Sequence, residues 1–263
     1  MYAFRDYEGR SMWDWKTESI LSKGPANVAI IEAHPDDPDH GIAGAAAIWA
    51  AMGHTVTYVI VTNGDKGSDD RDLSSADLIA TREREQRAAA AALGINDVLF
   101  LGWPDGMVVP DLKLRRELVR VMRMLKADVV CCDQPNQFFW GDDYINHPDH
   151  RAVAVAVLEG VFPAVQNHRY FPELLAEGYE THRVREVWIN TSNELANTIV
   201  DVTSVVEKKI AALQSHVSQG LSTDDLPWLR EWMAENGKRH EPPVPYAECF
   251  KVMRINSDNQ DDV

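Results

Sequence analysis

The chain has 263 residues and is 45% hydrophobic, so it can bury the core of one large α/β domain. Its 26 basic and 41 acidic residues give a formal charge of −15, which excludes nucleic acid and anionic membrane surfaces as expected partners. Three cysteines, two of them adjacent at Cys131 and Cys132, indicate buried reduced thiols rather than a disulfide framework. Because no apolar run is long enough to cross a bilayer, we expect a cytoplasmic protein without a membrane segment.

Four strand–loop–helix units are expected in the first two thirds of the chain. Apolar runs typical of strands buried on both faces occur at 27–31, 55–62, 97–101 and 127–132. Segments with helical patterning follow them at 41–52, 75–93, 111–126 and 148–165. This repetition predicts an α/β fold with a doubly wound, mostly parallel, Rossmann-like sheet and helices on both faces.

The remaining residues are expected to complete one domain spanning residues 1–263. Residues 1–26 form an N-terminal arm and 27–219 form the core, with strands at 184–190 and 196–202 and helices at 171–178 and 203–219. A C-terminal α/β elaboration at 220–263 contains a helix at 224–238, whose Trp228 and Trp232 are expected to pack on the body. An edge strand at 249–255 and a frayed tail at 257–263 follow. Trp13 and Trp15 of the arm suggest a lid or a subunit contact, which is compatible with a homo-oligomer.

Two His-Pro-Asp tripeptides stand directly after predicted strands, at residues 34–36 and 147–149. The carboxyl ends of parallel strands open on the same edge of a sheet, where ligands bind. Residues more than a hundred positions apart can therefore share one site. A single short motif of this kind arises easily by chance, but two of them at the same sheet edge do not.

The residue types in these two segments fit a catalytic metal centre. Catalytic zinc takes three nitrogen or carboxylate ligands and keeps one position for water. His34, Asp37 and His150 meet this requirement. Asp36, adjacent to a ligand, is suited to accept the proton of the water, and His147 is expected to face the same pocket.

These segments resemble the two signature motifs of the LmbE-like, or PIG-L, superfamily of zinc-dependent N-acetylglucosaminyl de-N-acetylases. Weaker similarities follow in the order of that family: Arg82-x-x-Glu85, Pro104-Asp105-Gly106, and the series Lys209, His216, Ser218, Gln219. The resemblance covers residues 28–219. It implies a metal-dependent hydrolase that removes the acetyl group from an N-acetylated amino sugar of the N-acetylglucosaminyl type.

The resemblance also implies roles for individual residues. His34, Asp37 and His150 correspond to ligands of Zn²⁺, or of another divalent metal. Asp36 corresponds to the general base. His147 corresponds to a histidine that stabilises the oxyanion or protonates the departing amine.

Substrate contacts and competing functions complete the hypothesis. Arg82 and Asp105 match positions that contact the sugar in relatives, and the aromatic residues 138–140 either stack on a sugar or pack against the N-terminal arm. The expected partner is a small amino-sugar substrate. Two alternatives remain: an amidase of the same fold that cleaves a larger amide conjugate, and a non-catalytic sugar-binding protein.

Several residues near the motifs allow more than one interpretation. Pro38 departs from the family pattern, in which that position is often acidic. We interpret His40 as a solvated turn residue and His216 as a helix-surface residue, although either one near the pocket is the alternative. Tyr144 is one residue away from a position that assists the oxyanion in some relatives and stays outside the catalytic set. Asp149 either fixes a histidine tautomer or caps a helix.

Overall fold

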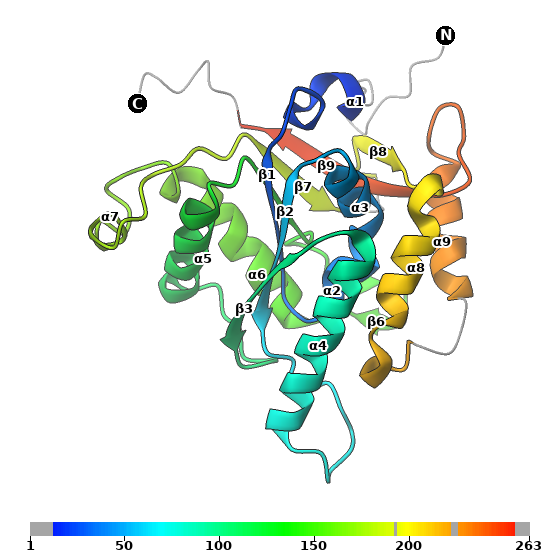
Figure 1. The fold of residues 1–263 in the computed structure, drawn as a ribbon, viewed down its shortest axis with the longest axis horizontal. Helices are drawn as coiled ribbons and strands as arrows, with labels where there is room; N and C mark the ends of the chain where they lie inside the picture. The colour runs from blue at the N-terminus through cyan, green and yellow to red at the C-terminus, as the bar shows by residue number, and fades with distance from the viewer. Residues whose placement is uncertain (1–12, 192–193, 222–225, 256–263) are drawn as a thin grey trace.

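The computed structural model describes residues 13–191, 194–221 and 226–255 (Figure 1). At its centre is a seven-stranded sheet with the order β3-β2-β1-β4-β7-β9-β8. The strands are β1 (Asn27–Glu32), β2 (Thr55–Thr62), β3 (Asp97–Trp103), β4 (Val129–Cys132), β7 (Glu186–Asn190), β8 (Thr198–Asp201) and β9 (Ala247–Arg254). Neighbours from β3 to β7 pair in parallel, whereas β9 is antiparallel to β7 and to β8. The predicted mostly parallel sheet is confirmed.

Helices cover both faces of this sheet (Figure 1). One face carries α3 (Ala43–Ala51), α4 (Ser75–Leu93), α8 (Val206–Gln214) and α9 (Pro227–Gly237), and the other carries α5 (Leu112–Leu125), α6 (Pro148–Glu159) and α7 (Glu173–Ala176). Side chains of β1 alternate between the two layers: Val28 and Ile30 join the first, and Ala29 and Ile31 the second. Within the described residues, no helix is both long and apolar enough to span a membrane.

Helix boundaries follow local capping where the caps are strong. Helix α4 has its predicted bounds because the Ser74 hydroxyl accepts from the Asp77 N–H at its start and Gly94 adopts a left-handed φ of 84° at its end. The helix predicted at 148–165 instead ends at Glu159. A π-helical turn, η2 (Gly160–Ala164), follows, in which Phe162 is non-helical because it precedes Pro163.

Two other predicted helices are divided. The segment 41–52 belongs to two helices, α2 (Asp37–Gly41) and α3, and the first of them begins earlier than predicted. The segment 203–219 is divided into the 3-10 turn η3 (Thr203–Val205), α8, and the 3-10 turn η4 (Val217–Gln219). The remaining short helices are α1 (Trp15–Glu18) and η1 (Ile20–Ser22).

The C-terminal strand was predicted at the edge of the sheet, and this prediction is wrong. Strand β9 lies between β7 and β8. Its Glu248 is fully buried, accepts from the N–H groups of Gly44 and Ala45 at the start of α3, and lies 2.6 Å from the Lys209 ammonium. A buried carboxylate is tolerated only when such partners surround it. Those of Glu248 lie far from it in the sequence, so the pattern at 249–255 does not reveal them.

The described part of the N-terminal arm is packed into the structure. Trp13 and Trp15 place their rings 6.0 and 6.3 Å from that of Trp188 in β7, in edge-on geometry. Trp15 is buried and Trp13 packs against the same core, which does not fit the lid, one of the two roles predicted for the arm; the subunit contact stays a prediction. Residues 1–12 of the arm and the tail at 257–263 lie outside the described residues. The three cysteines are buried and unpaired, as predicted.

Candidate active site

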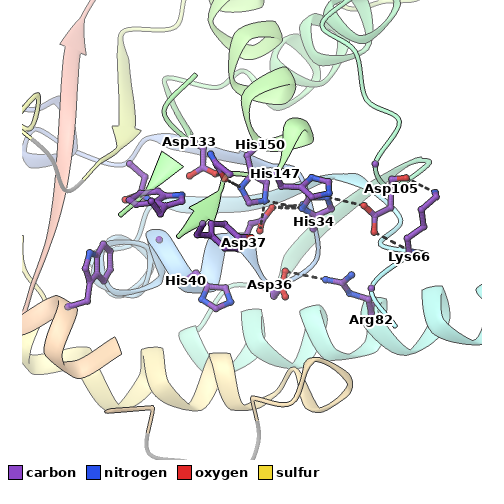
Figure 2. Close-up of a pocket in the computed structure, with 18 of the residues that line it drawn as sticks. His34, Asp36, Asp37, His40, Lys66, Arg82, Asp105, Asp133, His147 and His150 are labelled. Atoms are coloured by element: carbon purple, nitrogen blue, oxygen red, sulfur yellow. Dashed lines mark hydrogen bonds and ion pairs between the residues drawn. The ribbon is translucent and has the colours of Figure 1, made fainter. Parts of the chain in front are cut away.

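A pocket of about 990 Å³ opens at the carboxyl edge of the sheet (Figure 2). Its walls include residues from the loops after four parallel strands, among them His34 after β1, Lys66 after β2, Asp105 after β3 and Asp133 after β4. Strand β1 lies between β2 and β4, so successive units wind away from it in both directions. Open α/β sheets bind ligands at this kind of topological switch point.

Three predicted ligands converge in this pocket. The His34 Nδ1 atom lies 3.1 Å from Asp37 Oδ2 and 3.1 Å from His150 Nε2, and His150 Nε2 lies 3.2 Å from Asp37 Oδ1. Ligand atoms around a tetrahedral zinc ion, with bonds of about 2.0–2.2 Å, stand about 3.3–3.6 Å apart. The three groups therefore have nearly the spacing that one metal ion requires.

The other ring nitrogen of His34 faces two carboxylates. Its Nε2 lies 3.2 Å from Asp105 Oδ1 and 3.4 Å from Asp149 Oδ2. The fully buried Asp149 also accepts from the N–H groups of Gly106 and Val108, which hold it in place. A proton on Nε2 leaves the Nδ1 lone pair available to a metal. Of the two roles considered for Asp149, its contacts match the orienting one.

His150 is held in a similar way. Its Nδ1 lies 3.0 Å from Asn146 Oδ1 and 3.6 Å from Asp133 Oδ2, and the Asn146 amide in turn donates to the Gln137 carbonyl. This arrangement directs the lone pair of Nε2 toward His34 and Asp37. Sequence reasoning missed Asn146 and Asp133, because nothing distinguishes them from other polar loop residues.

Further ligand-type groups lie in the same pocket. His34, His147 and His150 bring ligand atoms within 4.8 Å of one another, and so does the set of His34, Asp105, His147 and Asp149. The described residues therefore contain a possible metal site, with His34 common to each combination.

Charge makes this point of the pocket suited to a cation. Burial lowers the pKa of His34, but Asp37 and hydrogen bonds to Asp105 and Asp149 outweigh it and raise that pKa to about 12. Burial opposes protonation of His150 too, yet Asp37 and Asp133 raise its pKa to about 9. The same carboxylates would attract a divalent ion in place of these protons.

Asp36 stands beside the ligands in an unusual backbone conformation. It is the N-cap residue of α2 with φ 114°, a region that costs a non-glycine residue about 1–3 kcal/mol. Its N–H donates to Gln86 Oε1 at 2.7 Å, and its carboxylate lies 3.2 Å from Arg82 Nη2. Burial and the neighbouring Asp37 raise the pKa of Asp36, while Arg82 acts in the opposite direction. The raised pKa favours proton uptake by this carboxylate.

Arg82 was predicted to contact a sugar, and the structure places it in the pocket wall. Its buried guanidinium also donates to the Pro35 and Gly64 carbonyls, at 2.6 and 3.2 Å. These contacts join the loops after β1 and β2. They hold the strained turn at Asp36 in place.

His147 caps the start of α6. Its Nδ1 accepts from the Asp149 N–H at 3.3 Å, so a neutral ring carries its proton on Nε2. The ring centroid lies 4.6 Å from that of His34, in edge-on geometry. Burial and the nearby His34 lower the pKa of His147, which favours the neutral form.

Comparison with known proteins agrees with this geometry. The family model PIG-L, described as GlcNAc-PI de-N-acetylase, matches residues 29–161, just over half of the chain. The chain belongs to the PIG-L family. The resemblance inferred from the two motifs is thus confirmed.

Individual relatives extend the similarity beyond that range. The diacetylchitobiose deacetylase of Thermococcus kodakarensis is 30% identical over 193 residues, which cover 73% of this chain and 69% of that protein. A probable N-acetyl-alpha-D-glucosaminyl L-malate deacetylase 2 of Bacillus anthracis is 29% identical, with 75% and 83% covered. The solved structure of N,N'-diacetylchitobiose deacetylase from Pyrococcus horikoshii superposes with a TM-score of 0.79 at 27% identity and covers 91% of each chain.

Two histidines of this PIG-L protein differ from their predicted environments. His216 is 0% exposed and its Nε2 lies 2.9 Å from Asp39 Oδ2, so the helix-surface interpretation is wrong. It lies beyond the end of α8, as the N-cap residue of the 3-10 turn η4. Asp39 also accepts from Gln86 Nε2 at 2.7 Å, which links His216 through Gln86 to the backbone of Asp36. His40 is not a solvated turn residue; it lines the pocket.

Aromatic side chains form part of the pocket wall in this family member. Trp228 of α9 stacks on His40 with ring centroids 5.6 Å apart, and it is 47% exposed rather than packed on the body as predicted. Trp232 lines the pocket too. In the hairpin of β5 (Phe139–Trp140) and β6 (Tyr144–Ile145), Trp140 pairs with Tyr144, and both line the pocket.

Proposed function

We propose that this chain is a zinc-dependent de-N-acetylase that hydrolyses the acetamide of an N-acetylglucosaminyl unit, with another divalent metal as the alternative. The observation that carries the proposal is the convergence of His34 Nδ1, Asp37 and His150 Nε2 at 3.1–3.2 Å, with the Asp36 carboxylate beside them. Membership of the PIG-L family supports it, as do relatives named as deacetylases of N-acetylated sugars.

The donor set suits the metal in this proposal. His34, Asp37 and His150 would hold the ion, while Asp105, Asp149 and Asn146 fix the two histidine tautomers. When bound, the ion would polarise the acyl oxygen and acidify a water molecule.

Asp36 would act as the general base and then as the general acid of the reaction. Its carboxylate accepts a proton from the attacking water and then delivers it to the amide nitrogen as the C–N bond breaks, because an amine anion is a very poor leaving group. Arg82 keeps that carboxylate in place. The products are acetate and the free amine: the water molecule supplies the oxygen that the acyl carbon gains and the proton that the nitrogen gains.

His147 would stabilise charge on the acyl oxygen. Since its Nδ1 accepts from the Asp149 N–H, its Nε2–H is the donor available to the oxyanion. The contacts of Arg82 and Asp105 position Asp36 and His34; contact of either residue with a sugar stays a prediction.

A larger amide conjugate is the second candidate substrate. The pocket of about 990 Å³ is at the upper end of the range of about 300–1,000 Å³ that accommodates drug-sized ligands. The acyl product distinguishes the two candidates, since only the deacetylase releases acetate.

Metal analysis and product assays together test the proposal. Purified protein should hold close to one equivalent of zinc or another divalent ion, and His34→Ala should lose it. The metal-loaded protein should release acetate from N-acetylglucosamine derivatives. Stoichiometric metal without hydrolysis of any acetylated sugar or larger amide would instead support a non-catalytic sugar-binding protein.

A further inference from the structure

We propose that the aromatic side of the pocket is a subsite for an uncharged ring linked to the N-acetylated sugar, with Trp228 as its specificity-determining contact. The aromatic side is formed by His40, Trp140, Tyr144, Trp228 and Trp232. The inference rests on the function proposed above and names the kind of substrate that this site selects.

The aromatic side begins next to the reacting centre. His40 belongs to the same short helix as Asp37, and Figure 2 shows it on the opposite side of His34 from Lys66 and Asp105. Trp228 stacks on His40 with an interplanar angle of 29°. A substrate group attached to the sugar on this side therefore leaves the acetamide within reach of Asp36.

The second wall of the subsite is the hairpin of β5 and β6. Trp140 and Tyr144 are directly opposite each other, so their side chains lie on the same face of the hairpin. Phe139 and Ile145 form the other pair and are 63% and 75% exposed. Aromatic side chains offer flat apolar faces that pack well against the C–H face of a sugar or another ring.

Charge disfavours an anionic group in this subsite. Among the described residues that line the pocket, the cationic side chains other than histidines are Lys66 and Arg82, and both already contact protein oxygens. Four carboxylates line the same pocket, namely those of Asp36, Asp37, Asp105 and Asp133. An attached dicarboxylate such as malate would therefore find no uncommitted Lys or Arg side chain among these described residues, whereas a neutral ring requires none.

Three substrates and three variants test the subsite by turnover. We expect kcat/KM for N,N'-diacetylchitobiose to exceed that for N-acetylglucosamine and for its malate glycoside by at least about tenfold. Trp228→Ala should reduce the ratio of disaccharide to monosaccharide kcat/KM about tenfold, and Trp228→Phe should retain most of it. Phe139→Ala, at an exposed aromatic residue that does not line the pocket, should leave the ratio unchanged.

Binding without turnover separates this inference from the proposed function. Calorimetry with metal-free protein should give a Kd for N,N'-diacetylchitobiose that rises about tenfold in Trp228→Ala. An equal Kd in both proteins, or a wild-type preference for the malate glycoside, would overturn the subsite. A Kd difference without acetate release by the metal-loaded enzyme would support the subsite and overturn the deacetylase.

Discussion

The same tripeptide, His-Pro-Asp, occurs at both halves of the site and performs different tasks in each. At residues 34–36 the helix begins after the tripeptide, with Asp36 as its N-cap. At residues 147–149 the helix begins inside it, with His147 as N-cap and proline as the first helical residue. The first aspartate therefore stands in the pocket wall, while the second is buried beneath His34.

Pro38 explains the difference between the two segments. If the first helix began at Pro35, Pro38 would be its fourth residue, whose N–H must donate to the N-cap carbonyl. Proline has no N–H, so that helix is disfavoured, whereas Arg151 meets the requirement in the second segment. With the helix starting at Asp37, Pro38 lies in the first turn, where proline is tolerated. The residue that departs from the family pattern thus fits the geometry of Asp36, the proposed general base.

The largest predicted effect separates the two aspartates by activity. Asp36→Asn should lower kcat by about 10²–10⁴-fold, because an amide cannot accept the water proton, while metal content is retained. Asparagine tolerates positive φ, so the fold should persist. Acetate release and metal analysis measure both effects. Asp69→Asn in an exposed loop serves as the control, and comparable losses in the two variants would refute the role of Asp36.

The opposite pattern is expected for the second aspartate. Asp149→Asn should weaken metal affinity by about 10–100-fold, because it removes a carboxylate that orients His34. Activity should recover substantially at saturating metal. Competition with a chelator measures the affinity. Unchanged metal affinity together with a loss of kcat that saturating metal does not restore would show that Asp149, like Asp36, acts in the chemical step.

Stability should depend on the network beneath the first segment. His216→Ala leaves the buried Asp39 without one of its partners, so the free energy of unfolding should fall by about 1–3 kcal/mol. Urea unfolding measures the change. His168→Ala, at an exposed position, should change it by less than about 0.5 kcal/mol. Equal stability of both variants would show that the His216 contact contributes nothing.

The smallest predicted effect is that of Pro38→Ala. Losing a compatible proline should lower the free energy of unfolding by about 0.4–1 kcal/mol through greater freedom of the unfolded chain. Because Arg82 and Gln86 still hold Asp36, we expect kcat to fall less than tenfold. Thermal unfolding and acetate release measure the two quantities. A loss as large as that of Asp36→Asn would mean that Pro38 alone prevents the alternative helix start.

Sequence predicted that the three candidate metal ligands converge in one pocket, because they lie in short local segments. His34, Asp37 and His150 belong to two short segments at strand ends, and parallel sheet topology brings such segments together. Strand β2 and helix α4 were likewise predicted with their observed bounds, from β-branched residues in one and two strong caps in the other.

The features that sequence missed depend on tertiary packing. The strand predicted at 249–255 was placed at the sheet edge, because Gly44 and Lys209, the partners of Glu248, are recognisable only once the sheet is assembled. The sequence around Trp228 is equally compatible with a helix that packs this side chain on the core and with one that turns it toward a pocket. His216 lies beyond the end of α8 as the N-cap residue of a 3-10 turn, a position that helical periodicity does not reveal.

The position of β9 has a consequence for synthesis on the ribosome. This strand is made after all other described elements, yet it lies inside the sheet, joins β8 to it, and caps α3 through Glu248 across 204 positions of sequence. During synthesis the chain emerges from the N-terminus onward, so the sheet cannot be completed until residue 254 has left the exit tunnel. The pocket walls built on β7 and α9 therefore reach their final arrangement late and together, and a nascent chain halted before that point would expose apolar sheet surface to chaperones.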